Sequence, residues 1–255
     1  MIRCGFSVRL SADDSVENQD EEYFFIEMNG NERRIRFHDY EEIYKIPGLY
    51  EHLFYDRLRC ESPQVVADLL ENEIEETPRS MSDLKVLDLG AGNGIVGKVL
   101  NKKGVNSIVG VDIIDEAAAA AKRDRPGIYD DYLVEDFSDI DDNLRNILEK
   151  NKFNCLTCVA ALGFNDIPSA AFANGFNLLQ ENGMVAFNIK PDFVEDGDST
   201  GFAYLIKEIV AEDILELKSE KRYCHRLSMN GDPINYVAMV GMKKAEIPEH
   251  VCREL

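Results

Sequence analysis

The sequence predicts an α/β fold with a doubly wound, mostly parallel seven-stranded sheet that ends in an antiparallel hairpin. Three observations support this prediction. Strand-like and helix-like segments alternate from residue 84 onward, which is typical of a parallel sheet with helices on both faces. A glycine-rich turn follows the first strand of the series. The last two strands are joined by a turn too short for a parallel crossover.

The alternating region contains five strand–helix units and a closing pair of strands. The predicted strands cover residues 84–89, 107–111, 132–135, 153–160, 184–189, 214–227 and 234–242. The predicted helices between them cover residues 94–103, 115–123, 141–150, 169–179 and 202–212. Asn230-Gly231-Asp232-Pro233 separates the final two strands, so they must run antiparallel.

The first 60 residues are predicted to form an N-terminal extension to a domain of residues 61–255. The first 20 residues are polar and acidic and predict a loose start. Strand-like runs at 23–28 and 33–37 flank Asn29-Gly30, a pair that strongly favours a hairpin turn.

An aromatic segment then leads into the larger domain. Tyr40, Tyr44, Tyr50 and Tyr55 do not share one clean helical face, so a simple core stripe is not the obvious interpretation. After it, Ser62 and Pro63 suit the N-cap and the first turn of a helix with an apolar face.

Composition argues against several classes of partner. A formal charge of −20 and a sequence pI near 4.6 disfavour nucleic acid and anionic lipid. No apolar run approaches the roughly 18 residues that cross a bilayer, and we expect no signal peptide. Cys155 and Cys158 have metal-ligand spacing but lie on one predicted strand, where they point to opposite faces. We therefore expect buried thiols, no metal site and a cytoplasmic protein.

The most informative segment is Val86-Leu87-Asp88-Leu89-Gly90-Ala91-Gly92-Asn93-Gly94. A buried strand, an acid and alternate glycines before a helix allow the backbone to approach a ligand closely. A carboxylate here would repel a pyrophosphate and would attract a cationic amino-acid nucleoside.

Asp88-x-Gly90-x-Gly92-x-Gly94 resembles the first motif of class I S-adenosylmethionine-dependent methyltransferases. The resemblance implies a Rossmann-like fold, S-adenosylmethionine as cofactor and S-adenosylhomocysteine as product. It places the cofactor against the motif residues, which include Ala91 and Asn93. Methyl transfer from a sulfonium is an in-line displacement that depends mainly on alignment of the reactants.

The ends of the next two strands supply acidic residues for the nucleoside. Asp112 ends the second strand, 22 residues after Gly90, where a carboxylate accepts from both ribose hydroxyls. Its alternative role, capping the following helix, is less attractive because Asp115 is available. Glu135, Asp136 and Phe137 resemble the adenine site of the superfamily, and Ile113 is expected to pack on the other adenine face.

The fourth strand runs into the segment 160–168, which faces the methionine end of the cofactor and the acceptor. Ala160 is the predicted contact there. The segment lacks Asn/Asp-Pro-Pro-Tyr, which argues against methylation of adenine N6 or of glutamine. The run from Ala161-Leu162-Gly163 to Pro168, the tyrosine-rich lead-in and Cys60-Glu61-Ser62-Pro63 carry a second resemblance. Over residues 40–190 the chain resembles the methyltransferase-like family typified by the Williams–Beuren syndrome region protein, which implies a small-molecule-type fold with poorly defined substrates.

The sequence predicts the residues on the acceptor side of the site less specifically. Tyr44 and Tyr55 are predicted to close over the cofactor, where aromatic faces attract a sulfonium. Arg59 is expected to meet the methionine carboxylate, with a surface ion pair as the alternative. His225 and Asp166 are the candidates for a catalytic base, although a structural or solvated role suits each of them better.

We predict a methyltransferase that acts on a small-molecule acceptor, and two alternatives remain. An NAD-dependent oxidoreductase fits the fold, but Ile95 stands where the third glycine of G-x-G-x-x-G belongs. The other alternative is a non-catalytic nucleoside-binding module. The acceptor atom, the substrate and the oligomeric state are not predicted from these residues.

Overall fold

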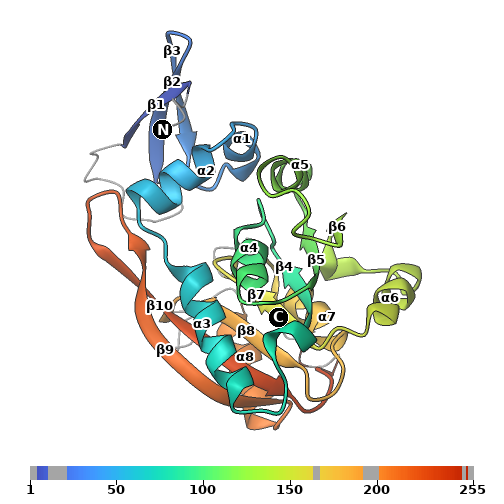
Figure 1. The fold of residues 1–255 in the computed structure, drawn as a ribbon. Coiled ribbons are helices and arrows are strands. Elements are labelled where there is room, and N and C mark those ends of the chain that lie inside the picture. Colours follow the sequence, from blue (N-terminus) through green and yellow to red (C-terminus); the bar gives the residue numbers. More distant parts are fainter. Residues whose placement is uncertain (1–4, 11–21, 163–166, 192–200, 249–250, 252–255) are drawn as a thin grey trace.

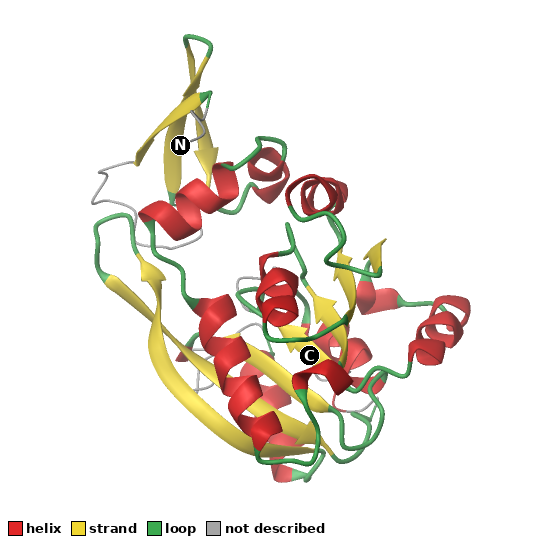
Figure 2. Cartoon of the chain, viewed as in Figure 1, coloured by secondary structure: helices red, strands yellow, loops and turns green. Residues whose placement is uncertain are grey.

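Two β-sheets organise the chain in the computed structural model shown in Figure 1. The structure describes residues 5–10, 22–162, 167–191, 201–248 and 251. A small N-terminal sheet lies apart from a large sheet, and two short helices stand between them (Figure 2). No described helix is long and apolar enough to span a membrane.

The large sheet has the predicted seven strands in the order β6-β5-β4-β7-β8-β10-β9. β4 to β8 run parallel, whereas β10 lies antiparallel between β8 and β9. The doubly wound fold with a C-terminal antiparallel hairpin is thus confirmed. The strands are β4 (Lys85–Leu89), β5 (Ser107–Asp112), β6 (Asp131–Val134), β7 (Cys155–Cys158), β8 (Met184–Ile189), β9 (Leu215–Leu227) and β10 (Pro233–Lys243).

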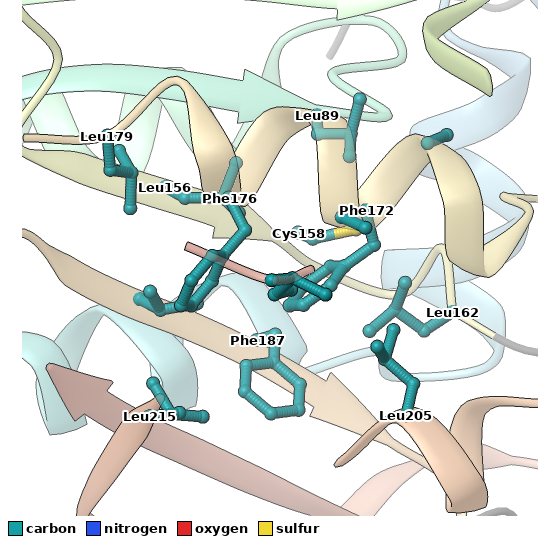
Figure 3. Close-up of a cluster of buried hydrophobic side chains, with 14 of the residues drawn as sticks. Leu89, Leu156, Cys158, Leu162, Phe172, Phe176, Leu179, Phe187, Leu205 and Leu215 are labelled. Carbon is teal, nitrogen blue, oxygen red and sulfur yellow. The ribbon is translucent and has the colours of Figure 1, made fainter. Parts of the chain in front are cut away.

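Helices cover both faces of this sheet because its central strands are apolar on both sides. Leu87 and Leu156 pack with Phe172 of α7 in one core. Figure 3 shows Leu156 and Phe172 in this core. Val86 and Cys155 pack with α3 and α4 in the other. The helices are α3 (Ser62–Glu75), α4 (Ile95–Lys102), α5 (Asp115–Asp124), α6 (Asp142–Leu148), α7 (Ser169–Asn177) and α8 (Phe202–Ala211). Cys158 joins the first core, so the two thiols lie on opposite faces as predicted.

The small sheet contains β1 (Phe6–Leu10), β2 (Tyr23–Met28) and β3 (Asn31–Arg36). Asn29 and Gly30 form the predicted hairpin turn, and both have positive φ, at 53° and 78°. β1 corrects the expectation of a loose start, because Phe6, Val8 and Leu10 alternate toward the N-terminal core.

The aromatic segment folds into short helices, α1 (Tyr40–Tyr44) and α2 (Leu49–Glu51), followed by a π-helical turn over His52–Arg57. Phe24, Phe37 and Leu53 belong to a hydrophobic core built from residues 24–58. The domain division at residue 60 stays a proposal, which this separate core supports.

The start of α3 differs from the prediction. Glu61 is the N-cap, and Ser62 and Pro63 occupy the first turn. The Ser62 hydroxyl is instead buried between strand residues, 2.5 Å from Nδ1 of His225 and 2.6 Å from the Tyr223 hydroxyl. It therefore joins α3 to β9 rather than capping the helix.

Candidate functional site

A cavity of about 310 Å³ lies at the carboxyl ends of β4, β5 and β7. Its volume falls in the usual range for small-molecule sites, and strand ends are where doubly wound folds bind ligands. Its walls come from the glycine turn, the ends of β5 and β6, the loop after β7 and the aromatic segment. The lining includes Gly90, Ala91, Gly92, Asn93, Asp112, Ile113, Glu135, Phe137, Ala160, Tyr40, Tyr44, Tyr50, Tyr55 and His38.

The glycine turn forms one wall with its backbone. Gly90 and Gly92 both have positive φ, at 70° and 53°. A Cβ at Gly92 would lie 2.6 Å from the Tyr44 hydroxyl, and one at Gly90 would lie 2.7 Å from Cδ1 of Ile167. Both the backbone conformation and the close approach of neighbours therefore require glycine.

Asp112 lies where the sequence placed it, at the end of β5 and in the cavity wall. Its two carboxylate oxygens accept from the backbone N–H groups of Gly92, at 2.9 Å, and Ile114, at 3.1 Å. Each oxygen keeps a further lone pair for a ligand. Burial raises the pKa of this carboxyl, while the two amide bonds favour its ionised form.

Asp88 does not line the cavity, so its predicted role toward the cofactor stays a prediction. It lies within β4, and alternation along the strand turns its side chain with Val86 toward the face that α3 and α4 cover. There it accepts hydrogen bonds from Tyr129, at 2.8 Å, and Thr157, at 2.7 Å. Burial raises its pKa to about 6. Gly94 also lies outside the cavity wall and is the N-cap of α4.

The end of β6 contributes two of its three predicted residues. Glu135 and Phe137 line the cavity, as does Ile113, whose side chain is 62% exposed. Asp136 does not line the cavity. Its carboxylate instead accepts from the backbone N–H and the hydroxyl of Ser138, at 2.9 and 2.6 Å, and caps a short turn. The aspartate is thus used locally as an N-cap.

Four tyrosines from the aromatic segment close the cavity on the side opposite the strands, and we call this group the tyrosine lid: Tyr40, Tyr44, Tyr50 and Tyr55. Neighbouring rings contact one another, and the centroids of Tyr44 and Tyr50 lie 5.2 Å apart. Burial raises the pKa of Tyr44 far above its usual range, so the phenol stays neutral.

Arg59 is not brought to the cavity. Its side chain is exposed and its backbone has a positive φ of 55°, at the bend that joins the aromatic segment to α3. Arg59 is not among the described lining residues, so its predicted contact with a ligand carboxylate stays a prediction.

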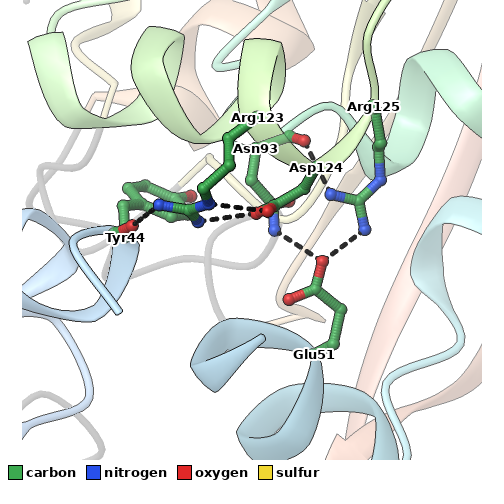
Figure 4. A network of polar contacts seen from close by, with 6 residues as sticks. All are labelled: Tyr44, Glu51, Asn93, Arg123, Asp124 and Arg125. Carbon is green, nitrogen blue, oxygen red and sulfur yellow. Dashed lines mark hydrogen bonds and ion pairs between the residues drawn. The ribbon is translucent and has the colours of Figure 1, made fainter. Parts of the chain in front are cut away.

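An ionic network ties the lid to the cofactor turn, as Figure 4 shows. Arg125, directly after α5, pairs with Glu51 of α2 at 2.5 Å and donates to the Asn93 carbonyl at 2.8 Å. The Asn93 amide donates to the same Glu51 oxygen at 3.1 Å. Arg123 adds a bond to the Tyr44 carbonyl at 3.0 Å. The sequence held no motif for Glu51 or Arg125, because these residues meet only when the lid folds over α5.

Of the two candidates for a base, the structure describes His225 alone. His225 is buried outside this cavity and lines the smaller one of about 30 Å³ beside it. It lies between Ser62 and the ring of Tyr236, and the two ring centroids are 4.2 Å apart. Burial, reinforced by the positive charge of Arg226, lowers its pKa to about 3, so it is neutral. Asp166 lies outside the described residues.

The sequence analysis missed one titratable residue of the cavity. His38 lies between β3 and α1 and lines both this cavity and a smaller adjoining one of about 30 Å³. Its ring meets that of Tyr40 edge to face at 5.8 Å. A single histidine after a hairpin has no spacing signal, so only the folded chain identifies it.

Comparison with known proteins agrees with this geometry. Residues 87–187 match the family model described as a methyltransferase domain. This segment is a class I methyltransferase domain. The match begins in β4 and ends in β8, so it spans the strands that build the cavity. S-adenosylmethionine is the cofactor of this domain, as the glycine motif predicts.

Among curated relatives, the ubiquinone biosynthesis O-methyltransferase of Glaesserella parasuis serovar 5 (strain SH0165) is 27% identical over 150 residues. The alignment covers 56% of this chain and 58% of the relative, so the chain matches little more than half of that protein's length. A second enzyme of the same name, from Actinobacillus pleuropneumoniae serotype 7 (strain AP76), is 26% identical over 146 residues and is covered to the same extents, 56% and 58%.

A solved structure of similar fold is the N-methyltransferase NodS from Bradyrhizobium japonicum WM9 with S-adenosylhomocysteine. It has a TM-score of 0.54 and 11% identity, and the match covers 81% of this chain and 97% of that one. At this identity the likeness concerns the fold alone. The methyltransferase fold is confirmed, while the resemblance to the Williams–Beuren family stays a prediction.

Proposed function

We propose that this chain transfers a methyl group from S-adenosylmethionine to the hydroxyl of a small, neutral acceptor. The observation that carries the proposal is the cavity itself, which places Gly90, Gly92 and Asp112 opposite the tyrosine lid. The printed name of the curated relatives, O-methyltransferases of ubiquinone biosynthesis, supports oxygen as the acceptor atom.

The lining suits the cofactor chemically. Asp112 has lone pairs free for two ribose hydroxyls after accepting its two backbone bonds. Ile113 and Phe137 offer apolar surfaces for a base, and Glu135 offers an acceptor for an exocyclic amine. The lid presents aromatic faces, which attract a sulfonium more strongly than a neutral thioether.

Bound S-adenosylmethionine supplies an electrophilic methyl group, and the protein's task is alignment. Asp112 and the glycine turn hold the nucleoside, and the tyrosine lid excludes water from the reacting atoms. No covalent nucleophile from the chain is needed for an in-line displacement.

The acceptor end of the cavity favours an uncharged molecule. Tyr40, Tyr50, Tyr55, Pro63 and Val159 provide aromatic and apolar surface. Among the described lining residues, the carboxylates Asp112 and Glu135 belong to strand ends on the nucleoside side, and His38 is the one imidazole. We therefore assign His38 as the group that accepts the hydroxyl proton.

Titration calorimetry with S-adenosylmethionine, S-adenosylhomocysteine and NAD tests the cofactor. We expect micromolar binding of both adenosyl compounds and none of NAD, and the reverse preference would favour the oxidoreductase. A screen of phenols, amines and thiols for release of S-adenosylhomocysteine tests the reaction. Turnover would exclude a non-catalytic binding module, and we expect it with phenols.

The role of His38 has its own test. His38→Ala should lower kcat on the best phenol by about 100-fold, the usual size of a general-base contribution, with the cofactor Kd unchanged. Retained kcat in this variant would remove the assignment and leave a methyltransferase without a base.

A further inference from the structure

The connection between α5 and β6 supports the glycine turn from the side away from the cavity. Two of its side chains, together with Tyr132 of β6, contact the turn or the strand before it. Arg125 donates to the Asn93 carbonyl, Tyr132 donates to the Gly92 carbonyl at 2.6 Å, and Tyr129 donates to Asp88 at 2.8 Å. The two hydroxyls and the guanidinium thus donate hydrogen bonds to buried carbonyl and carboxylate groups on the side of the turn that faces away from the cavity.

Tyr129 fills a slot that exists because three glycines lack side chains. A Cβ at Gly94, at the end of the turn, would lie 3.0 Å from its ring. A Cβ at Gly97 in α4 would lie 2.8 Å from it, and one at Gly110 in β5 would lie 3.0 Å from it. The ring thus packs against the turn, the following helix and the neighbouring strand at once. Such close packing on three elements fixes their relative positions.

The hydroxyl at the end of this ring reaches the most deeply buried carboxylate near the site. Asp88 is 1% exposed, and its other described donor is Thr157 of β7 at 2.7 Å. An ionised carboxylate in this setting depends on such donors to offset the loss of water, and Tyr129 and Thr157 are the donors that the described part of the chain supplies.

We propose that Tyr129 is a positioning residue for the cofactor: its ring braces the glycine turn, and its hydroxyl keeps Asp88 ionised beneath it. This inference rests on the proposed function, since it concerns binding of a cationic amino-acid nucleoside in the same cavity. Asp88 does not touch the cavity, and it acts as a fixed negative charge behind the turn that attracts the ligand's ammonium group through the protein.

The surroundings of Asp88 contain no described cation that would replace this role. Asp112 of β5 adds a second negative charge nearby, and the thiols of Cys155 and Cys158 are neutral because burial raises their pKa. Tyr132 stands at right angles to Tyr129, with ring centroids 5.3 Å apart, and is also neutral. The two hydroxyl donors therefore set the charge of Asp88, whose carboxyl has a pKa of about 6.

The test is the pH dependence of S-adenosylhomocysteine affinity, measured by calorimetry from pH 5.5 to 8.5. Wild-type affinity should fall as the pH drops through about 6. Tyr129→Phe keeps the ring and removes the donor, so the fall should begin about one pH unit higher. The variant should bind about fivefold more weakly than wild type at pH 6 and equally well at pH 8.

Thr157→Val removes the other donor from Asp88 and should move the profile in the same direction. Tyr23→Phe, which alters a tyrosine of the small N-terminal sheet, should match the wild type at every pH. An unchanged profile for Tyr129→Phe, or an equal loss of affinity at pH 6 and pH 8, would overturn the proposal. Absence of binding by the wild-type protein would instead reject the proposed function.

Discussion

Arg125 and Glu51 form an ion pair at 2.5 Å that joins two parts of the chain 74 residues apart. The Arg125 side chain is 6% exposed, so the guanidinium of the pair is largely shielded from solvent. The same guanidinium binds the Asn93 carbonyl in the glycine turn. One side chain therefore couples the position of the lid to that of the turn beneath it.

Arg125→Met should loosen the lid. The change leaves Glu51 without its cation and the Asn93 carbonyl without its donor, which should lower the free energy of unfolding by about 2 kcal/mol. We expect S-adenosylhomocysteine to dissociate about tenfold faster, measured by stopped-flow fluorescence, because the closed lid is less favoured. Arg33→Met is the matched control, since Arg33 makes an exposed pair with Glu42 and should cost about 0.5 kcal/mol or less. An unchanged dissociation rate would show that the ion pair does not hold the lid.

Gly92→Ala should weaken cofactor binding while the domain still folds. The new Cβ meets the Tyr44 hydroxyl and the backbone has a positive φ, so both the lid and the turn must move. We expect at least a tenfold rise in the Kd of S-adenosylhomocysteine and a loss of about 1–2 kcal/mol in stability. Gly231→Ala separates the two effects, because Gly231 also has a positive φ, of 89°, but no atom lies within 4 Å of its Cβ position. It should show the stability loss with unchanged affinity.

Tyr44→Leu and Tyr55→Leu should each discriminate between the cofactor and its product. A leucine keeps apolar cover but has no π face, so only the attraction for the sulfonium is lost. We expect affinity for S-adenosylmethionine to fall about fivefold more than affinity for S-adenosylhomocysteine in the same titration. Equal losses for the two ligands would mean that the lid acts by packing alone.

Much of the fold followed from local patterns in the sequence. The strand–helix alternation predicted each strand of the large sheet to within a few residues, and the short turn at 230–233 predicted the antiparallel end. Asn29-Gly30 predicted the N-terminal hairpin because its conformation is a local property. β1 was not predicted, because its three apolar residues form a strand face only when β1 pairs with β2.

The sequence predicted the site residues correctly where backbone geometry determines the residue type. Glycines 90 and 92 and Asp112 lie in the cavity wall because a turn and a strand end place them there. The motif identified Asp88 but not the direction of its side chain, which strand alternation places behind the turn. His38, Glu51 and Arg125 were missed because their neighbours come from distant segments.

The acid stability of the protein should depend measurably on His225. The pKa of His225 is 6.5 in an unfolded chain and about 3 in the folded chain. Between these two pH values the imidazole is therefore protonated in the unfolded chain and neutral in the folded chain. Stability contributed by neutral His225 is therefore lost as the pH falls from about 6.5 toward 3, and the loss reaches about 2 kcal/mol at pH 5.

Asp88 acts in the opposite direction over much of the same range. Its pKa rises from 3.8 to about 6 on folding, so the folded chain binds the extra proton and gains stability as the pH falls through 6. The two effects offset each other in wild type, and comparison with His225→Gln separates them. Urea unfolding at pH 7 and pH 5 should show that wild type loses about 2 kcal/mol more than this variant on acidification. Equal losses in the two proteins would mean that His225 is protonated in the folded state, contrary to its burial against Ser62 and Tyr236.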